Sequence, residues 1–242
     1  MRTSSTNIIL AGIAICDLFN RSTVILNKLV LGDNEECYNF HKFSIQFLIV
    51  CINATYDTFR RVSAYLGVSM ALIRYLVIRY VSNSKYNGLS ENRFGLKTIV
   101  ALSILSMAFS SVYFSNFYFF EAMHWEPKDQ CLGYPVNYTE IYYYPIFTDE
   151  FKTNKWINVN NYMLVDGIVN IIPAVVIPVL TFLLIRELRM VRVARKKRTQ
   201  STKPDHTTKM IILMTVASMI AEGSIGMAYL FQGLAGSDMA FM

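Results

Sequence analysis

Ionisable side chains inside long apolar stretches are the residues of this sequence that could do chemistry. Asp57, Arg60 and Arg61 stand three and four positions apart, so on a helix both arginines come within reach of one carboxylate. Charges in apolar surroundings are costly and need a partner or a task. The spacing therefore indicates either an internal ion pair that fixes helix packing or charges that face a ligand cavity, and both interpretations stay open.

Two further acids raise the same question. Asp17 ends the apolar segment Gly12-Ile-Ala-Ile-Cys-Asp, where it is either a polar group hydrogen-bonded to a neighbouring helix or a cation site. Glu222 lies near the middle of the last apolar stretch, where a ligand-pocket role and a packing role are equally compatible with the sequence. Asp166 and Asn170 are polar groups within another such stretch. We predict a ligand pocket formed by Asp57, Arg60, Arg61 and Glu222.

Enzyme and metal chemistry have little support in the sequence. No nucleophile and base stand in a recognisable arrangement, and none of the four cysteines forms a CxxC pair. We therefore expect no catalytic residue, no metal and no cofactor.

Five apolar stretches position these residues. Hydrophobic residues make up 53% of the chain and charged residues 17%, against about 25% in soluble domains. Each stretch is roughly 20–30 residues long, enough to cross a hydrocarbon layer of about 30 Å as a helix. We predict an all-α fold, a polytopic transmembrane bundle of about five helices in a single domain, 1–242. The predicted spans are about 7–31, 51–80, 96–120, 161–187 and 209–233.

The charges between these spans predict their orientation. Segments 81–95 and 186–209 are basic, whereas 32–50 and 121–158 are richer in acids. Because basic connections stay in the cytosol, we expect a cytoplasmic N-terminus. The net charge of +6 lies beside apolar runs, which indicates a lipid bilayer as partner and no nucleic acid.

The outer connection between the third and fourth spans carries a further signal. Its sequon Asn137-Tyr-Thr lies on the side where glycosylation is possible. Aromatic residues are dense at 113–120 and 142–145, where we expect a membrane-interface belt or, alternatively, the lining of a peptide site.

Several motifs resemble a known receptor family. The stretch Ser69-Met-Ala-Leu-Ile-Arg-Tyr-Leu-Val-Ile is similar to the acid-Arg-Tyr region of rhodopsin-like receptors. A closer resemblance, spanning nearly the whole chain, is to the nematode serpentine receptors of class W, which are related to FMRFamide-type neuropeptide receptors. The stretches that carry it are Ile13-Ala-Ile-Cys-Asp, Asp57-Thr-Phe-Arg-Arg-Val-Ser, Pro178-Val-Leu-Thr-Phe-Leu-Leu-Ile-Arg-Glu-Leu-Arg, and Ala221-Glu with Gly226.

The resemblance implies roles for residues at the inner end of the bundle. Arg74, followed by Tyr75, would be the latch that is released to meet a G protein. Arg195 and Lys196, in the basic extension of the fourth span, would belong to the coupling surface. Ile73 departs from the family pattern, because an acid usually precedes this arginine.

The resemblance also implies a polar core and a disulfide. Asp17 and Ser63 would form a sodium-binding or polar core. The partner of Cys131 would be Cys37 or Cys51, and the resemblance favours Cys37, which follows two acids as in the family.

The family pattern places these spans as receptor helices two to six. Ser224 replaces the proline expected after Glu222, and the helices expected before the first span and after the fifth are missing. We therefore expect a truncated receptor.

These observations predict a G-protein-coupled receptor in the plasma membrane. Its partners would be an extracellular peptide or small-molecule ligand, neuropeptide or chemosensory, and a heterotrimeric G protein. One alternative is a truncated, non-signalling receptor fragment. A transporter or channel is another alternative, although the sequence lacks the repeats of such proteins.

Overall fold

The computed structural model describes part of the chain in detail. The described residues are 5–30, 37, 39, 41–80, 88–128, 131, 133–154, 158–196 and 206–235. Within the helices, the side chains of 27–30, 191–196, 206–215, 217–218, 221–222 and 235 lie outside the description.

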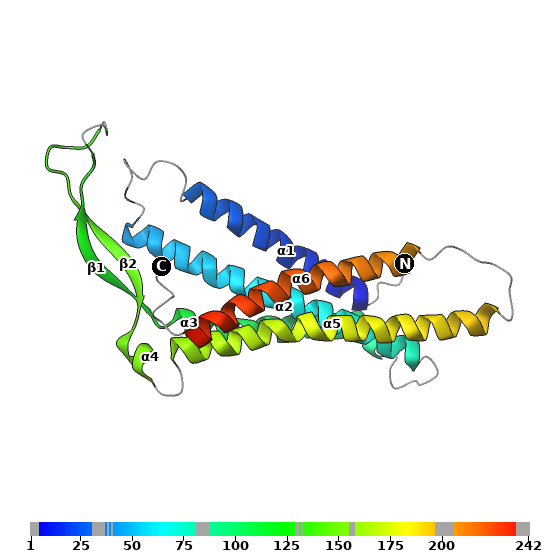
Figure 1. Cartoon of the computed structure of the whole chain (residues 1–242). Coiled ribbons are helices and arrows are strands. Elements are labelled where there is room, and N and C mark those ends of the chain that lie inside the picture. Colours follow the sequence, from blue (N-terminus) through cyan, green and yellow to red (C-terminus); the bar gives the residue numbers. More distant parts are fainter. Residues whose placement is uncertain are drawn as a thin grey trace.

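Five long helices form the body of the molecule (Figure 1). They are α1 (Ser5–Val30), α2 (Phe43–Arg79), α3 (Asn92–Phe114), α5 (Val159–Lys196) and α6 (His206–Ala235). Among the described residues, four segments are long and apolar enough to cross a membrane, and they lie in α1, α2, α3 and α5. The chain is therefore a polytopic helical bundle, as the sequence predicted.

The helix bounds differ from the predicted spans by more than five residues at three places, one of which is the end of α5 at Lys196 rather than near residue 187. Helix α2 begins at Phe43 rather than near residue 51, and α3 ends at Phe114 rather than near residue 120. After α3 the chain enters strand β1 (Phe117–Trp125), which pairs antiparallel with β2 (Glu140–Phe147). Phenylalanine and tyrosine favour extended backbone, so the aromatic run ends the helix and builds a hairpin that an all-α prediction missed. The short helix α4 (Asp149–Thr153) leads from β2 towards α5.

The hairpin marks one end of the bundle and basic residues mark the other (Figure 1). Helix α3 ends and α5 begins at the hairpin end. Helix α2 ends and α3 begins at the opposite end, where Arg79 and Arg93 lie and α5 runs out through its basic extension to Lys196. We call these the hairpin end and the basic end.

Small residues let the helices approach closely. A Cβ atom added at Gly167 would lie 2.8 Å from the backbone nitrogen of Leu230, and one at Gly226 only 2.6 Å from Ile171. These glycines therefore permit the close contact between α5 and α6, as small residues do in membrane helix pairs. The helices α1, α2 and α3 share an apolar core of Ile9, Cys16, Val62, Leu66 and Ile73.

The outward faces of the helices are strongly apolar. Leu18, Ile104, Phe182 and Ile220 each expose more than half of their surface, at 68%, 63%, 69% and 66%. Charged residues such as Arg61 and Asp166 are instead buried. This inverted arrangement fits a bundle whose solvent is lipid.

Candidate functional site

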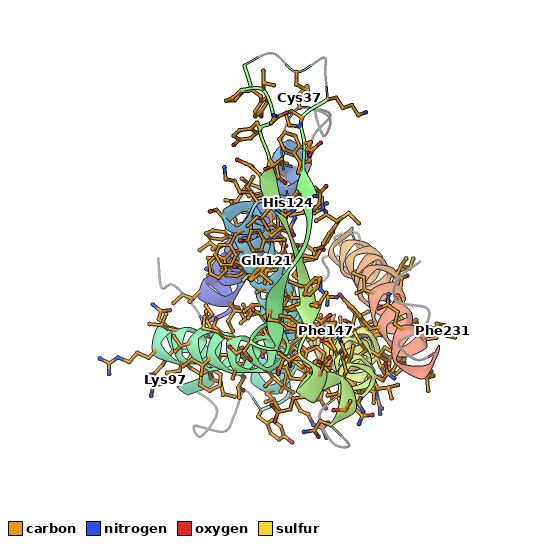
Figure 2. The ribbon with its side chains drawn as sticks, turned by 90° about the vertical axis from the view of Figure 1, so that its left-hand side faces the viewer. Cys37, Lys97, Glu121, His124, Phe147 and Phe231 are labelled. Atoms are coloured by element: carbon orange, nitrogen blue, oxygen red, sulfur yellow. A yellow bond between two sulfur atoms is a disulfide. The ribbon has the colours of Figure 1, made fainter. Side chains whose placement is uncertain are left out.

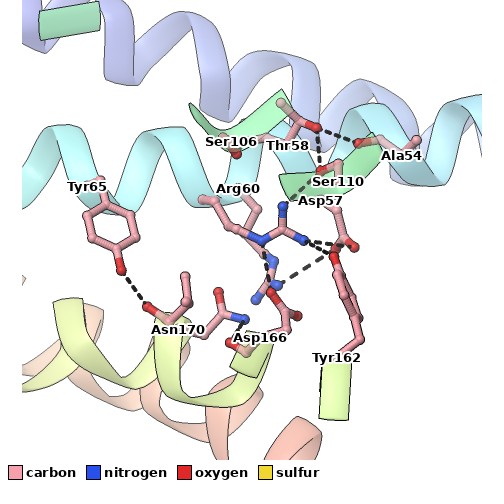
Figure 3. A network of polar contacts seen from close by, with 12 residues as sticks. Ala54, Asp57, Thr58, Arg60, Tyr65, Ser106, Ser110, Tyr162, Asp166 and Asn170 are labelled. Carbon is pink, nitrogen blue, oxygen red and sulfur yellow. Dashed lines mark hydrogen bonds and ion pairs between the residues drawn. The ribbon is translucent and has the colours of Figure 1, made fainter. Parts of the chain in front are cut away.

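Arg61, near the middle of α2, is the centre of a buried polar network. Its partners Ser110, Tyr162 and Asp166 are labelled in Figure 3. Its Nε donates to Asp166 Oδ1 at 2.9 Å, its Nη1 donates to Ser110 Oγ at 2.8 Å, and its Nη2 donates to the Tyr162 hydroxyl at 3.4 Å. The same Nη2 lies 3.5 Å from Asp57 Oδ2. One side chain of α2 thereby joins α3 and α5, and its buried charge is matched by two carboxylates.

Hydroxyl groups complete the contact between α2 and α3. The hydroxyls of Thr58 and Ser110 lie 2.8 Å apart, and Ser106 Oγ donates to the Thr58 carbonyl at 3.0 Å. Serine is small enough to bring α3 close to α2 while it satisfies a buried polar group. These contacts fix the rotamer of Ser110, which in turn accepts from Arg61.

Arg60 is buried beside this network but is not satisfied by it. Its nearest counter-charge is Asp57, at 3.7 Å from its Nη2, and its guanidinium lies 5.5 Å from the ring centroid of Tyr229 on α6. No nitrogen of its guanidinium has a hydrogen-bond acceptor among the described residues. An unpaired buried donor costs free energy, so Arg60 has donors to offer to another group.

An aromatic cluster separates the network from the hairpin. Tyr162 stacks on Tyr113 with ring centroids 4.6 Å apart, and Tyr113 contacts Phe147 of β2 at 5.2 Å and the buried Phe151 of α4 at 6.4 Å. Because Tyr162 also receives a hydrogen bond from Arg61, it connects the ionic network to Tyr113 and, through that ring, to Phe147 at the base of the hairpin. The prediction of a membrane-interface belt missed this packing role.

The hairpin is tied down at its other end (Figure 2). A disulfide joins Cys37 to Cys131, and the hydroxyl of Tyr134 donates to the Cys37 carbonyl at 2.8 Å. This is the pairing that the resemblance favoured. Cys51 is a free, exposed cysteine on α2. Asn137, in the same loop, is exposed and has a φ of 64°, a left-handed conformation that asparagine tolerates.

Glu140 links the hairpin to the start of α2. Its carboxylate accepts hydrogen bonds from the Tyr138 hydroxyl, from Lys42 Nζ at 3.0 Å and from Asn39 Nδ2 at 3.2 Å. These donors, the Tyr138 hydroxyl first, hold the pKa of Glu140 below its ordinary value.

Asp17 and Ser63 do meet, away from the network around Arg61. Ser63 Oγ donates to Asp17 Oδ1 at 2.8 Å, but Asp17 is an exposed residue of α1. The structure therefore brings these two residues together, and it places them on a face of the bundle rather than in its interior.

The residues predicted to couple to a G protein lie towards the basic end. Arg74 is exposed, whereas Tyr75 is buried and its hydroxyl accepts a hydrogen bond from Arg79. The backbones of Arg195 and Lys196 belong to α5, and their side chains lie outside the described residues. The same holds for Glu222 in α6, so its predicted pocket role remains a prediction.

The residues predicted to form a ligand pocket are only part of the buried polar network and its aromatic neighbours. Asp57, Arg60 and Arg61 lie together, but Ser110, Tyr162 and Tyr229 were missed. Asp166, an acid within an apolar stretch, carried a recognisable signal in the sequence, but its pairing with Arg61 did not.

The helical bundle, its apolar exterior and its buried ionic network define a polytopic membrane protein. Residues 1–242 match the family described as serpentine type 7TM GPCR chemoreceptor Srw, and the chain belongs to that family. This is a family of receptors rather than of enzymes. No curated protein matches the chain significantly.

Proposed function

We propose that this chain is a plasma-membrane receptor that binds an extracellular peptide or small molecule and signals through a heterotrimeric G protein. The observation that carries the proposal is the ionic network with its unsatisfied arginine, Arg60. Membership of a chemoreceptor family supports the receptor class. We propose an orientation in which the hairpin end is extracellular and the basic end and the N-terminus are cytoplasmic, because basic connections stay in the cytosol.

The geometry suggests how a ligand would be recognised. Arg60 lies between Asp57 of its own helix and Tyr229 of α6, with its guanidinium donors free of described acceptors. A ligand carbonyl or carboxylate that accepted from Arg60 would remove the cost of those free donors. Such a ligand would bind between α2 and α6, with Asp57 and Glu222 as further pocket residues.

Binding there would reach the cytoplasmic side through rigid helices. Arg60 and Arg74 lie fourteen positions apart on α2, about 21 Å along the helix axis. A ligand that binds one arrangement of α2 and α6 more tightly shifts the population towards that arrangement. Arg74, Tyr75 and the basic extension of α5 with Arg195 and Lys196 would then meet the G protein.

The first test of this function is the substitution Arg74→Ala. We expect it to abolish ligand-stimulated nucleotide exchange on the G protein while surface expression stays near that of the unsubstituted chain, because Arg74 is exposed and its loss leaves no cavity. Stimulation would come from a synthetic peptide library with each member in amidated and free-acid form. Arg93→Ala, a loss of another exposed arginine at the basic end, is the control. Unchanged coupling in Arg74→Ala would contradict the proposed role.

A further inference from the structure

A groove lies between α5 and α6, far from the ionic network and towards the basic end. Its volume is about 500 Å³, and its apolar walls include Pro178, Phe182 and Ile185 of α5 with Val216 and Met219 of α6. Phe182 and Val216 are exposed, at 69% and 46% of their surface. The groove therefore opens on the outward, apolar face of the bundle.

Two arginines line the same groove. Arg186 and Arg189 stand three positions apart, so they project from one face of α5. Both are exposed, and neither forms an ion pair or hydrogen bond with a residue that the structure describes. Their charges are therefore available to an anion.

The position of the groove fits the boundary between hydrocarbon and water. The segment of α5 that can span a membrane is Val159–Met190, so Arg186 and Arg189 fall in its last turn or so. Long basic side chains at such a boundary keep their stems in the apolar layer and extend their heads to the headgroups. A guanidinium also matches the oxygens of a phosphate with two parallel hydrogen bonds.

We infer that this groove binds an anionic phospholipid, with the headgroup phosphate between Arg186 and Arg189 and an acyl chain along Phe182 and Val216. The occupant must be apolar along most of its length and anionic at one end, which is the charge pattern of such a lipid. A polypeptide arriving from the aqueous phase would have to cover walls that already face the hydrocarbon. A lipid held by both helices would favour the arrangement in which α5 and α6 line the groove together.

The test uses the whole chain purified into nanodiscs of phosphatidylcholine, alone or mixed with phosphatidylserine. Native mass spectrometry after mild extraction would measure the retained lipid. We expect one retained phosphatidylserine, bound in preference to phosphatidylcholine. Two arginines each contribute on the order of 1 kcal/mol to attraction by an anionic lipid, so Arg186→Gln with Arg189→Gln should weaken this binding roughly 25-fold.

Three further variants make the test specific. Arg93→Gln with Lys97→Gln removes two exposed charges at the basic end of α3, outside the groove, and should leave retention unchanged. Arg186→Lys with Arg189→Lys keeps the charge but loses the parallel hydrogen bonds, so it should retain more binding than the glutamine pair and less than the unsubstituted chain. Such partial retention would show that the fold tolerates substitution there. Val216→Trp fills the apolar part and should also displace the lipid.

Specific outcomes would overturn the inference. The inference would fail if phosphatidylserine and phosphatidylcholine were retained equally. It would also fail if Arg93→Gln with Lys97→Gln weakened phosphatidylserine binding as much as Arg186→Gln with Arg189→Gln does, because the arginines would then act only as general surface charge. If Val216→Trp retained phosphatidylserine fully, the proposed acyl-chain site along Phe182 and Val216 would be wrong. Crosslinking of Val216→Cys to a second copy or to a cytosolic protein, without a preference for phosphatidylserine, would assign the groove to that partner.

Discussion

Adjacent arginines in the middle of α2 have different surroundings because neighbouring helix positions point about 100° apart. Arg61 faces α3 and α5, where each part of its guanidinium meets an acceptor. Arg60 faces α6, where it meets an aromatic ring instead. The first arginine is therefore suited to holding the bundle together, and the second to meeting a ligand.

The pairing of Asp57 with both arginines was predictable, whereas the pairing of Arg61 with Asp166 was not. The first follows from helical spacing of three and four residues. The second joins residues 105 positions apart and depends on which helices become neighbours. Likewise, nothing distinguishes Ser110 in sequence from the other serines of α3, because its role comes from the side chain opposite it.

The substitution Asp166→Asn should destabilise the bundle by about 3 kcal/mol, because it removes one carboxylate from the buried Arg61 and leaves that charge undercompensated. Thermal unfolding in detergent would measure the effect. The control is Asp149→Asn, since the side chain of Asp149 is 87% exposed and forms an ion pair with the nearby Lys152 at 3.3 Å. Replacing the pair together, as Arg61→Met with Asp166→Leu, should recover much of the loss. An unchanged unfolding temperature in Asp166→Asn would show that the pair contributes little.

At the scale of elements, the helices were predictable and the hairpin was not. Long apolar stretches of membrane length carry a strong signal, which explains why all five predicted spans overlap a helix. The run after Tyr113 is equally apolar, and apolarity alone does not separate a helix end from a strand. The extended backbone there is stabilised by pairing with β2, whose residues come 15 to 30 positions after their partners in β1, as for Trp125 with Glu140 and Phe117 with Phe147.

Glycines on α6 provide a test of helix packing. Gly226→Ala should destabilise the pair α5–α6 by about 1–3 kcal/mol, because the added methyl would lie 2.6 Å from Ile171 and 3.1 Å from the Gly167 carbonyl. Gly223→Ala, three positions earlier in the same helix, meets only Ala174 at 3.8 Å. We expect that control to be neutral or slightly stabilising, because alanine favours helix more than glycine does. Equal unfolding temperatures for the two variants would rule out close packing at Gly226.

The anchor of the hairpin should depend on pH through Glu140. Its pKa is lowered in the folded chain, chiefly by the Tyr138 hydroxyl and then by Lys42. Its contribution to stability is therefore complete above its ordinary pKa of 4.5 and is lost as the pH falls through the lower folded value. Amide hydrogen exchange in β2, corrected for the intrinsic pH dependence of exchange, should show weaker protection in the acidic range.

Substitution separates this carboxyl from the other acids of the hairpin. Glu140→Gln should remove most of the pH dependence, whereas Glu126→Gln, at an exposed residue just after β1, should leave it in place. If protection of β2 stayed constant to well below pH 4.5, the carboxylate would not be part of the anchor.

At the scale of the whole molecule, the distribution of charge and apolar surface determines how the bundle sits in a membrane. Exposed side chains along α1, α3 and α5 are large and apolar, so the bundle sides must face hydrocarbon. Among the described residues, Arg79 at the end of α2 and Arg93 and Lys97 at the start of α3 lie at the end opposite the hairpin. The amino-acid sequence alone predicts this asymmetry, because it depends only on the order of charges and spans along the chain.

The orientation can be tested with epitope tags on cells. Tags inserted at Gly88 and at Gln200 should be reached by antibody only after permeabilisation, because both lie in basic connections, which the proposed orientation places in the cytosol. A tag at Val136, 94% exposed in the hairpin loop, should be reached on intact cells and serves as the positive control. Asn137, its neighbour, should carry an enzymatically removable glycan that Asn137→Gln abolishes. All three tags report on the orientation of one bundle. Staining at Gly88 on intact cells would therefore contradict the proposed orientation, and it would place Arg74 on the extracellular side, where it cannot meet a G protein.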